Sequence, residues 1–355
     1  MCSEDVYKRQ IVFRQDRTNP STAISNWKGR KDTPRAWAST AVSNWLNGAL
    51  FGGGATGGWA YFFGSGSVSG WGRGDNIDKM DSATETRTTL TSVIATGRYQ
   101  ATGNGNAGVA AYCNFGDSGS GNLNSTEKIS FTADSTSVLT STNPGGSYYG
   151  GGQGTNQGVK AYYMGGNKYP ITATVYDMPF ATETWGTLSN ALTYSPLTFP
   201  SCSDNGVAAY AAGTYTGDKT NVDKMPFATE TPASLSDTLS QGDGYSNGGF
   251  GQYGVTGSVF INSFSTMYEF NISFTTDAVT DGTWSLWNRK YASGCSISDT
   301  AGYTSGGTSF GGGALSWTDT LQKNEFPSMT HSILTATLSE ANLGSTSATN
   351  ETALI

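Results

Sequence analysis

A ten-residue motif recurs along most of the sequence. The clearest copies are VDKMPFATET at 222–231 and VYDMPFATET at 175–184, and looser copies begin at 77, 127, 269 and 321. The position of Phe227 supplies one marker residue per copy, and successive markers are 49, 49, 47, 47 and 52 residues apart: Ser82, Phe131, Phe180, Phe227, Phe274 and Phe326. A period of about 48 residues predicts a repeat architecture in which each unit packs on its neighbours.

A second recurring stretch is short, apolar and bounded by glycine. It reads GVAAYCNFG from Gly108, GVKAYYMGG from Gly158 and GVAAYAAG from Gly206, with weaker forms GSVFINSF from Gly257 and GTSFGGG from Gly307. Each copy is typical of a buried strand. The unit then contains four strands, which we label a to d: one such as RYQATGN (98–104), the GVAAY strand, the VDKM strand, and a short strand after the ATET turn. No segment has a helical period long enough for a parallel crossover, so the strands should be antiparallel.

Four-stranded antiparallel units repeated in a ring predict an all-β fold, the β-propeller. We expect six blades of four strands, with the N- and C-terminal strands sharing one blade and so closing the ring. The alternative is a seventh blade within residues 11–47. Some motifs also resemble kelch repeats: AYYMGG (161–166) resembles the apolar strand ending in a glycine pair, and YDMPFATETW (176–185) resembles the Tyr-Asp strand, turn and Trp. The resemblance assigns Arg98, and also Arg35, to positions between blades.

These patterns divide the chain into four parts. Residues 1–10 resemble the lead-in of translated environmental reads that run into adapter, so we expect them to be non-native. Residues 11–47 are expected to form an N-terminal arm or partial blade, residues 48–340 the kelch-like propeller, and residues 341–355 a C-terminal tail that is frayed or committed to a partner.

The charge of the chain limits its partners. Its net charge is −7, whereas binding to a phosphate backbone requires a basic surface, so we expect no nucleic-acid partner. It contains no apolar run of 18 residues, so we expect no membrane span.

Residue types that usually perform catalysis or bind metals are sparse. His331 is the single histidine, and four cysteines show no CxxC spacing and no histidine at ligand spacing: Cys2, Cys113, Cys202 and Cys295. This pattern disfavours a zinc site. Arg289 is the one arginine after Arg98, which disfavours the arginine cluster of a sialidase-like site. We expect no catalytic residue, no metal and no cofactor.

An acidic residue follows five of the markers at the same distance. Because a catalytic pair would break the symmetry of the repeat, recurrence of one carboxylate per unit indicates a structural role in the turn. We expect these side chains and the neighbouring threonines to bond local backbone N–H groups. The residues are Glu85, Asp134, Glu183, Glu230 and Asp277.

The two faces of such a ring differ in sequence. The a–b and c–d turns are short and repetitive and emerge on one face, which we call the turn face. The b–c and d–a connections vary and emerge on the opposite face, the loop face; they include 116–126, 143–157, 191–205 and 241–254. Variable loops on a repeated scaffold are where recognition usually occurs, and aromatic side chains suit sugars or protein surfaces. The predicted binding residues are Tyr148, Tyr149, Tyr194, Phe199, Tyr245, Phe250 and Tyr253.

The prediction for function is therefore a non-enzymatic binding or structural module that contacts a glycan or a protein surface. In style and repeat the chain resembles propeller repeats of marine phage structural and adhesin-like proteins, which implies a virion or extracellular location and virion proteins as further partners. The alternatives are a secreted bacterial carbohydrate-binding protein and a glycan-acting propeller enzyme.

Overall fold

The described part of the chain consists of strands and turns. The structure, a computed structural model, describes residues 58–65, 73–145, 152–156, 158–166, 173–194, 201–204, 206–213, 220–241, 245–252, 255–263, 266–282, 293–297, 301–311, 314–326, 328–342 and 346–349. They all belong to one compact unit, Gly54–Leu354. Within them no helix has the length and apolar character that crossing a membrane requires.

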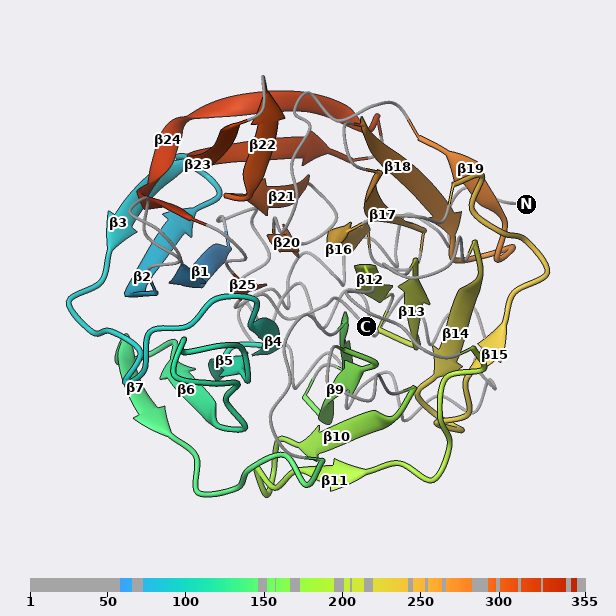
Figure 1. The fold of residues 1–355 in the computed structure, drawn as a ribbon, viewed down its shortest axis with the longest axis horizontal. Helices are drawn as coiled ribbons and strands as arrows, with labels where there is room; N and C mark the ends of the chain where they lie inside the picture. Colours follow the sequence, from blue (N-terminus) through green and yellow to red (C-terminus); the bar gives the residue numbers. More distant parts are fainter. Residues whose placement is uncertain are drawn as a thin grey trace, which may run out of the picture. The chain divides into compact units, whose positions relative to one another are not determined.

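Six antiparallel sheets follow one another around a ring, with four strands in each of the first five and five in the sixth (Figure 1). The first three blades, listed from the centre outward, are β25 (Thr346–Thr349), β1 (Trp59–Ser65), β2 (Gly74–Asp81), β3 (Thr86–Thr89); β4 (Thr102–Asn106), β5 (Ala110–Asn114), β6 (Thr126–Ser130), β7 (Ser135–Val138); and β8 (Gly152–Asn156), β9 (Lys160–Met164), β10 (Val175–Pro179), β11 (Gly186–Thr187).

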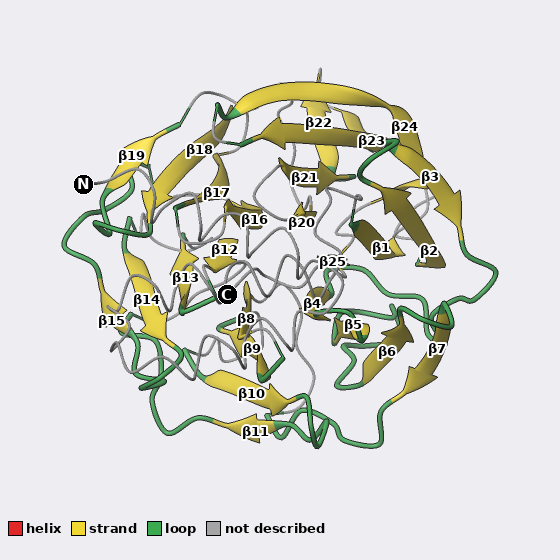
Figure 2. Ribbon diagram, turned by 180° about the vertical axis from the view of Figure 1, so that it is seen from behind, coloured by secondary structure: helices red, strands yellow, loops and turns green. Residues whose placement is uncertain are grey.

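The other three blades continue the circle, and the view from behind shows the same radial order (Figure 2). Their strands are β12 (Ser201–Asp204), β13 (Ala208–Ala212), β14 (Val222–Pro226), β15 (Ala233–Ser234); β16 (Tyr245–Gln252), β17 (Thr256–Ser263), β18 (Thr266–Ser273), β19 (Val279–Asp281); and β20 (Ser293–Ile297), β21 (Ala301–Ser305), β22 (Thr308–Gly311), β23 (Ala314–Glu325), β24 (Thr330–Asn342). The predicted six-bladed β-propeller is confirmed.

The markers occupy equivalent positions in the blades. The backbone N–H of Phe131 donates to the carbonyl of Val109, just before strand b, at 3.1 Å, and Phe227 bonds Val207 in the same way at 2.8 Å. Three residues after each marker the backbone is left-handed, with φ between 47° and 59°: Glu85, Asp134, Glu183, Glu230, Asp277 and Met329. A non-glycine residue at positive φ is uncommon, so its recurrence in six blades confirms that the markers identify one repeated turn.

The marker phenylalanines also build the core, which lies between adjacent blades. Each packs against an aromatic ring on strand b of the preceding blade: the ring centroids of Tyr112 and Phe180 are 5.4 Å apart, and those of Tyr162 and Phe227 are 5.2 Å apart. Buried aromatic pairs add to the free energy gained from burying apolar area. The repeat therefore joins each blade to the next.

The last described strand closes the ring. β25 pairs antiparallel with β1, from Ala60 opposite Thr349 to Phe63 opposite Thr346. The prediction that N- and C-terminal strands share a blade is confirmed. The expectation that this part of residues 341–355 is a frayed tail was wrong. The short polar sequence TSAT forms a strand because β1, in the first blade, offers an unpaired inner edge where the chain completes the ring.

The sixth blade departs from the sequence prediction in its second strand. The segment equivalent to GVAAY is β21, in which Ala301 lies opposite Glu325, and not the stretch from Gly307. β22 lies further along the same partner strand, β23. Gly306 and Gly307 separate the two strands with φ of 63° and 96°, a conformation that glycine adopts without steric cost.

The innermost strands were the elements least visible in the sequence. β8, β12 and β16 lie inside stretches that we expected to be variable loops. Their residues are mainly Gly, Ser, Asn and other small or polar types, which are depleted in ordinary strands. Small size is needed here: a Cβ on Gly154 would lie 2.6 Å from the Cβ of Ala209 in the next blade. Close approach of blades near the axis favours residues that, in isolation, resemble a loop.

Candidate functional site

The repeated acidic residues join neighbouring blades. Lys224 Nζ donates to both carboxylate oxygens of Asp277, at 2.8 and 2.7 Å, and the Tyr210 hydroxyl donates to Asp277 at 2.9 Å. The same arrangement of a strand-b tyrosine, a lysine and the next blade's turn carboxylate, which we call the clasp, occurs in four seams: Tyr61, Lys79 and Asp134; Tyr112, Lys128 and Glu183; Tyr162, Lys160 and Glu230; Tyr210, Lys224 and Asp277. Lys323 and Glu85 join the sixth blade to the first.

The clasps fix protonation states that suit a scaffold. Burial raises the pKa of Tyr162, and the hydrogen bond to the Glu230 carboxylate raises it further. Burial also opposes ionisation of Glu230, but hydrogen bonds from Lys160 and Tyr162 outweigh this and hold its pKa below the usual value. The predicted structural role of these carboxylates in the turn is confirmed. The expectation that they bond local backbone was wrong, since the left-handed residue directs its side chain to the adjacent blade.

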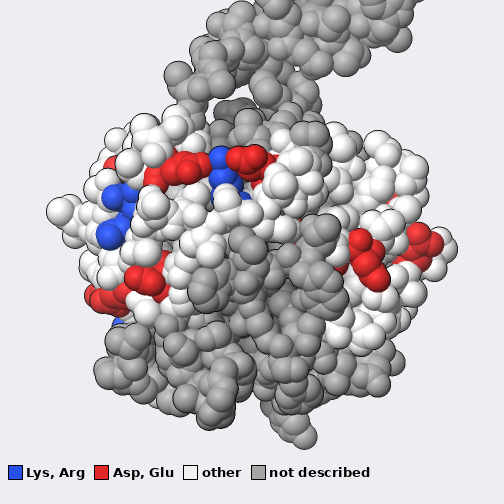
Figure 3. Space-filling model, turned by 90° about the horizontal axis from the view of Figure 1, so that it is seen from above, with Lys and Arg blue, Asp and Glu red and all other residues white. Residues whose placement is uncertain are grey.

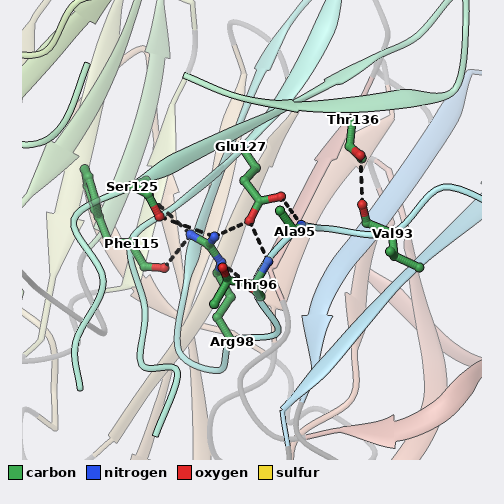
Figure 4. Close-up of polar contacts among 8 residues, drawn as sticks. All are labelled: Val93, Ala95, Thr96, Arg98, Phe115, Ser125, Glu127 and Thr136. Carbon is green, nitrogen blue, oxygen red and sulfur yellow. Dashed lines mark hydrogen bonds and ion pairs between the residues drawn. The ribbon is translucent and has the colours of Figure 1, made fainter. Parts of the chain in front are cut away.

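A buried ion pair connects the first two blades. Arg98 lies between β3 and β4, is fully buried, and donates five hydrogen bonds, among them to the carbonyls of Phe115 and Ser125 and to the Glu127 carboxylate. Glu127 on β6 also accepts the backbone N–H groups of Ala95 and Thr96 (Figure 4). Every polar group of the pair thus has a partner, which is the condition under which a buried pair is tolerated.

The fifth seam replaces the clasp with a different set of residues. Phe260, Glu269 and Met329 occupy the positions of the tyrosine, the lysine and the turn carboxylate. The Glu269 side chain is fully buried, and His331 Nε2 lies 3.2 Å from its Oε2. His331, the single histidine, is therefore part of a blade seam. Its other ring nitrogen contacts Asn324.

Nearly all described basic side chains bind carboxylates within the propeller. On one edge of the molecule, groups of acidic and basic atoms lie within a mainly uncharged surface (Figure 3). Among the residues that the structure describes, every lysine and two of the three arginines donate a hydrogen bond to a carboxylate: Lys79, Lys128, Lys160, Lys224, Lys323, Arg87 and Arg98. Arg73 differs. Its Nη2 approaches Asp117 Oδ1 only to 4.0 Å, which is too long for a hydrogen bond.

Arg73 belongs to a polar cluster on the loop face. It ends the connection from β1 to β2, Tyr99 lies in the connection from β3 to β4, and Asp117 lies in the connection from β5 to β6. Arg73 Cζ is 5.8 Å from the centroid of the Tyr99 ring. The Tyr99 hydroxyl donates to Asp117 at 3.3 Å. We call these three residues the Arg73 cluster.

The predicted binding residues fall in different places. Tyr194 is half-buried and its hydroxyl donates to the Asn221 carbonyl at 2.6 Å, so it packs between the third and fourth blades. Tyr245 begins β16, at the end nearer the loop face. Phe250 lies two residues before the end of β16, where the short turn to β17 begins; its expected position in a loop-face connection was wrong. Tyr148, Tyr149, Phe199 and Tyr253 lie outside the described residues.

The Arg73 cluster was not predicted from the sequence. Its three members are separated by 26 and 18 residues and come from connections of different blades. The available signal was weak: an arginine beside glycines in a variable connection.

The described cysteines are structural. Cys113 and Cys295 are buried free thiols, and burial raises the pKa of the Cys113 thiol to about 12. A thiol is reactive mainly as thiolate, so Cys113 is inert at neutral pH. Within the described ranges, no group of three or more His, Cys, Asp and Glu side chains could hold a metal ion.

Fold and site together define a six-bladed β-propeller whose described charges mainly join its blades. No protein-family model matches the chain, and no curated protein matches it. The kelch-like and phage-like resemblances therefore remain predictions.

Proposed function

We propose that this protein is a non-catalytic binding module that recognises a glycan or a protein surface through its loop face. The observation that carries the proposal is the contrast between the faces. The turn-face carboxylates are bound in repeated clasps, whereas the loop face holds Arg73, a basic side chain that makes no hydrogen bond to the described part of the chain. Function on a repeated scaffold resides in the parts that are not repeated.

The sequence supports the same face. Tyr148 and Tyr149 lie in the connection from the second to the third blade, and aromatic residues are favoured in recognition surfaces because they contribute large contact area at low entropic cost. The propeller is a rigid base for such loops. We further propose that the protein acts at a virion or extracellular surface, on the sequence resemblance to phage adhesin-like repeats.

The proposal is tested by measuring binding of the purified chain to a glycan array and to candidate surface proteins. Tyr148→Ala/Tyr149→Ala should weaken binding about tenfold or more, since each aromatic anchor contributes roughly 1–2 kcal/mol at a recognition surface. The matched control is Val109→Ser/Val159→Ser, which alters two half-exposed side chains on the turn face and should leave binding unchanged.

Loss of binding in the valine variant with retention in the tyrosine variant would move recognition to the turn face and overturn the proposal. Conversion of a bound glycan to shorter products would support the rival class, a glycan-acting enzyme. Both results are read from the same samples, by array fluorescence and by chromatography of the sugar.

A further inference from the structure

Arg73 presents a partly exposed guanidinium on the loop face. Its side chain is 30% exposed, it makes no hydrogen bond to any residue that the structure describes, and the Asp117 carboxylate oxygen is 4.0 Å away. A guanidinium has five N–H donors in a fixed planar arrangement. Arg98, which has a structural role between two blades, donates five hydrogen bonds. Among the described residues Arg73 approaches Asp117 and the Tyr99 ring without a hydrogen bond, so its N–H donors can serve a ligand.

The guanidinium lies against the loop that contains Gly119, and a Cβ added to Gly119 would overlap it. The loop beneath it is fixed by paired backbone hydrogen bonds between Tyr99 and Asp117, at 3.1 and 3.0 Å, and by the bond from Ser118 to the Gly121 carbonyl. Such preorganisation lowers the entropic cost of binding.

We propose that the Arg73 cluster binds the carboxylate of an acidic sugar, such as a uronic or sialic acid residue of a glycan. This inference rests on the proposed function and names its ligand class. The Arg73 fork suits bidentate hydrogen bonds to a carboxylate. The half-buried Tyr99 ring lies beside the guanidinium, and an aromatic side chain next to a carboxylate-binding group suits the C–H face of a sugar ring.

The electrostatics favour one carboxylate over a polyanion. Asp117 already accepts hydrogen bonds from the Tyr99 hydroxyl and the Gly119 N–H, so its role is to hold the aromatic ring and the loop in register. A single guanidinium in a chain of net charge −7 neutralises one ligand charge, whereas a nucleic acid needs several basic contacts. An acidic peptide offers the carboxylate without the adjoining C–H ring face.

The test uses the whole chain with oligosaccharides ending in glucuronate or sialate, and the same sugars with the carboxylate reduced to an alcohol. Calorimetric titration should show binding at least tenfold weaker to the reduced sugars. Arg73→Gln should weaken binding to the acidic sugars by about tenfold to a hundredfold, the range for loss of charged hydrogen bonds. Arg73→Lys should bind with intermediate affinity, because it keeps the charge and loses the fork.

Two glycine substitutions test whether the position of the Arg73 guanidinium, and not only its charge, is needed for binding. Gly119→Ala keeps the arginine but displaces its guanidinium, so it should reduce affinity as much as Arg73→Gln. Gly108→Ala is the matched control: its φ of +69° resembles the +77° of Gly119, nothing lies within 4 Å of the added Cβ, and it is on the turn face. Its affinity should equal that of the unaltered chain, and thermal unfolding checks that all four variants fold.

The outcomes distinguish this inference from the proposed function. Equal binding of acidic and reduced sugars, unaffected by Arg73→Gln, would overturn the inference while the loop-face function stands. Failure of the unaltered chain to bind any sugar, with a protein bound instead, would overturn the inference alone. Failure to bind either class would overturn both. Tighter, Arg73-dependent binding of an acidic peptide would overturn the assignment to sugars.

Discussion

Two neighbouring seams share the same backbone turn but differ in their side chains: the seam between the fourth and fifth blades and the seam between the fifth and sixth blades. In the first, Tyr210 and Lys224 bind the Asp277 carboxylate across the seam. In the second, Phe260 packs with Phe326 and Met329, and Phe260, Glu269 and Met329 stand in the positions of the tyrosine, the lysine and the turn carboxylate. The turn is left-handed in both, with φ of 59° at Asp277 and 54° at Met329.

The comparison shows that the carboxylate does not create the turn. The repeated geometry comes from backbone pairing, because the turn is the same in the first blade, where the marker is Ser82 and Glu85 has a φ of 53°; the clasp is added to this turn. Where the clasp is missing, the seam instead contains the buried contact between Glu269 and His331. The two seams should therefore respond differently to mutation.

The largest expected effect is at the buried pair. His331→Leu leaves the fully buried Glu269 side chain without the imidazole that lies 3.2 Å from its Oε2. A buried polar group left without a partner should lower the free energy of unfolding by about 3 kcal/mol. Urea unfolding monitored by tryptophan fluorescence measures the change. The double variant His331→Leu/Glu269→Leu removes both polar groups and should recover most of the loss, because replacing both partners by apolar groups can be nearly neutral.

Equal destabilisation in the single and double variants would show that packing, and not the loss of the polar partner of Glu269, limits the stability of the fifth seam. Ser258 retains a partner in the double variant, since its hydroxyl also bonds Asn271 at 2.7 Å.

A smaller effect should come from exchanging the aromatic residues of the two seams. Tyr210→Phe removes one hydrogen bond to a charged acceptor and should cost about 1–2 kcal/mol, measured in the same unfolding experiment. Phe260→Tyr adds a hydroxyl beside Met329, which offers it no carboxylate, and should give no gain. A stabilising Phe260→Tyr would contradict the view that the turn carboxylate is what makes tyrosine useful.

The smallest effect concerns acid. The pKa of Glu230 lies below its usual value because the hydrogen bonds from Lys160 and Tyr162 outweigh the opposing effect of burial. A carboxylate whose folded pKa is depressed contributes stability above its unfolded pKa of about 4.3, and this is lost as the pH falls through the folded value. Glu230→Gln should flatten the decline of stability below about pH 4 by less than about 1 kcal/mol, since the clasp is partly exposed.

The matched control for the acid experiment is Asp75→Asn. Asp75 is exposed on β2, and its carboxylate has no partner among the described residues. Stability measured against pH should be unchanged by this substitution. A slope altered equally by both substitutions would indicate a general charge effect.

Much of the fold could be predicted because its signals are local. The period of the markers predicted six blades, the GVAAY and VDKM stretches predicted strands b and c, and the recurrence of one carboxylate per unit predicted a structural role. Each strand and turn signal lies within a short stretch, and the stretch repeats at a regular spacing, both of which a sequence displays directly.

Tertiary structure alone decided the rest, because the determining partners come from other blades. The glycine-rich axial strands, exemplified by Gly154, are strands because neighbouring blades crowd them. Thr346–Thr349 form a strand because β1 has a free edge at ring closure. Likewise, the clasp carboxylates bind lysines that are 53 to 55 residues away in three of the four complete clasps, 70 away in the third blade seam, and 238 away where the ring closes. The Arg73 cluster exists only where three connections meet, so sequence determined the repeat and ring geometry determined the site.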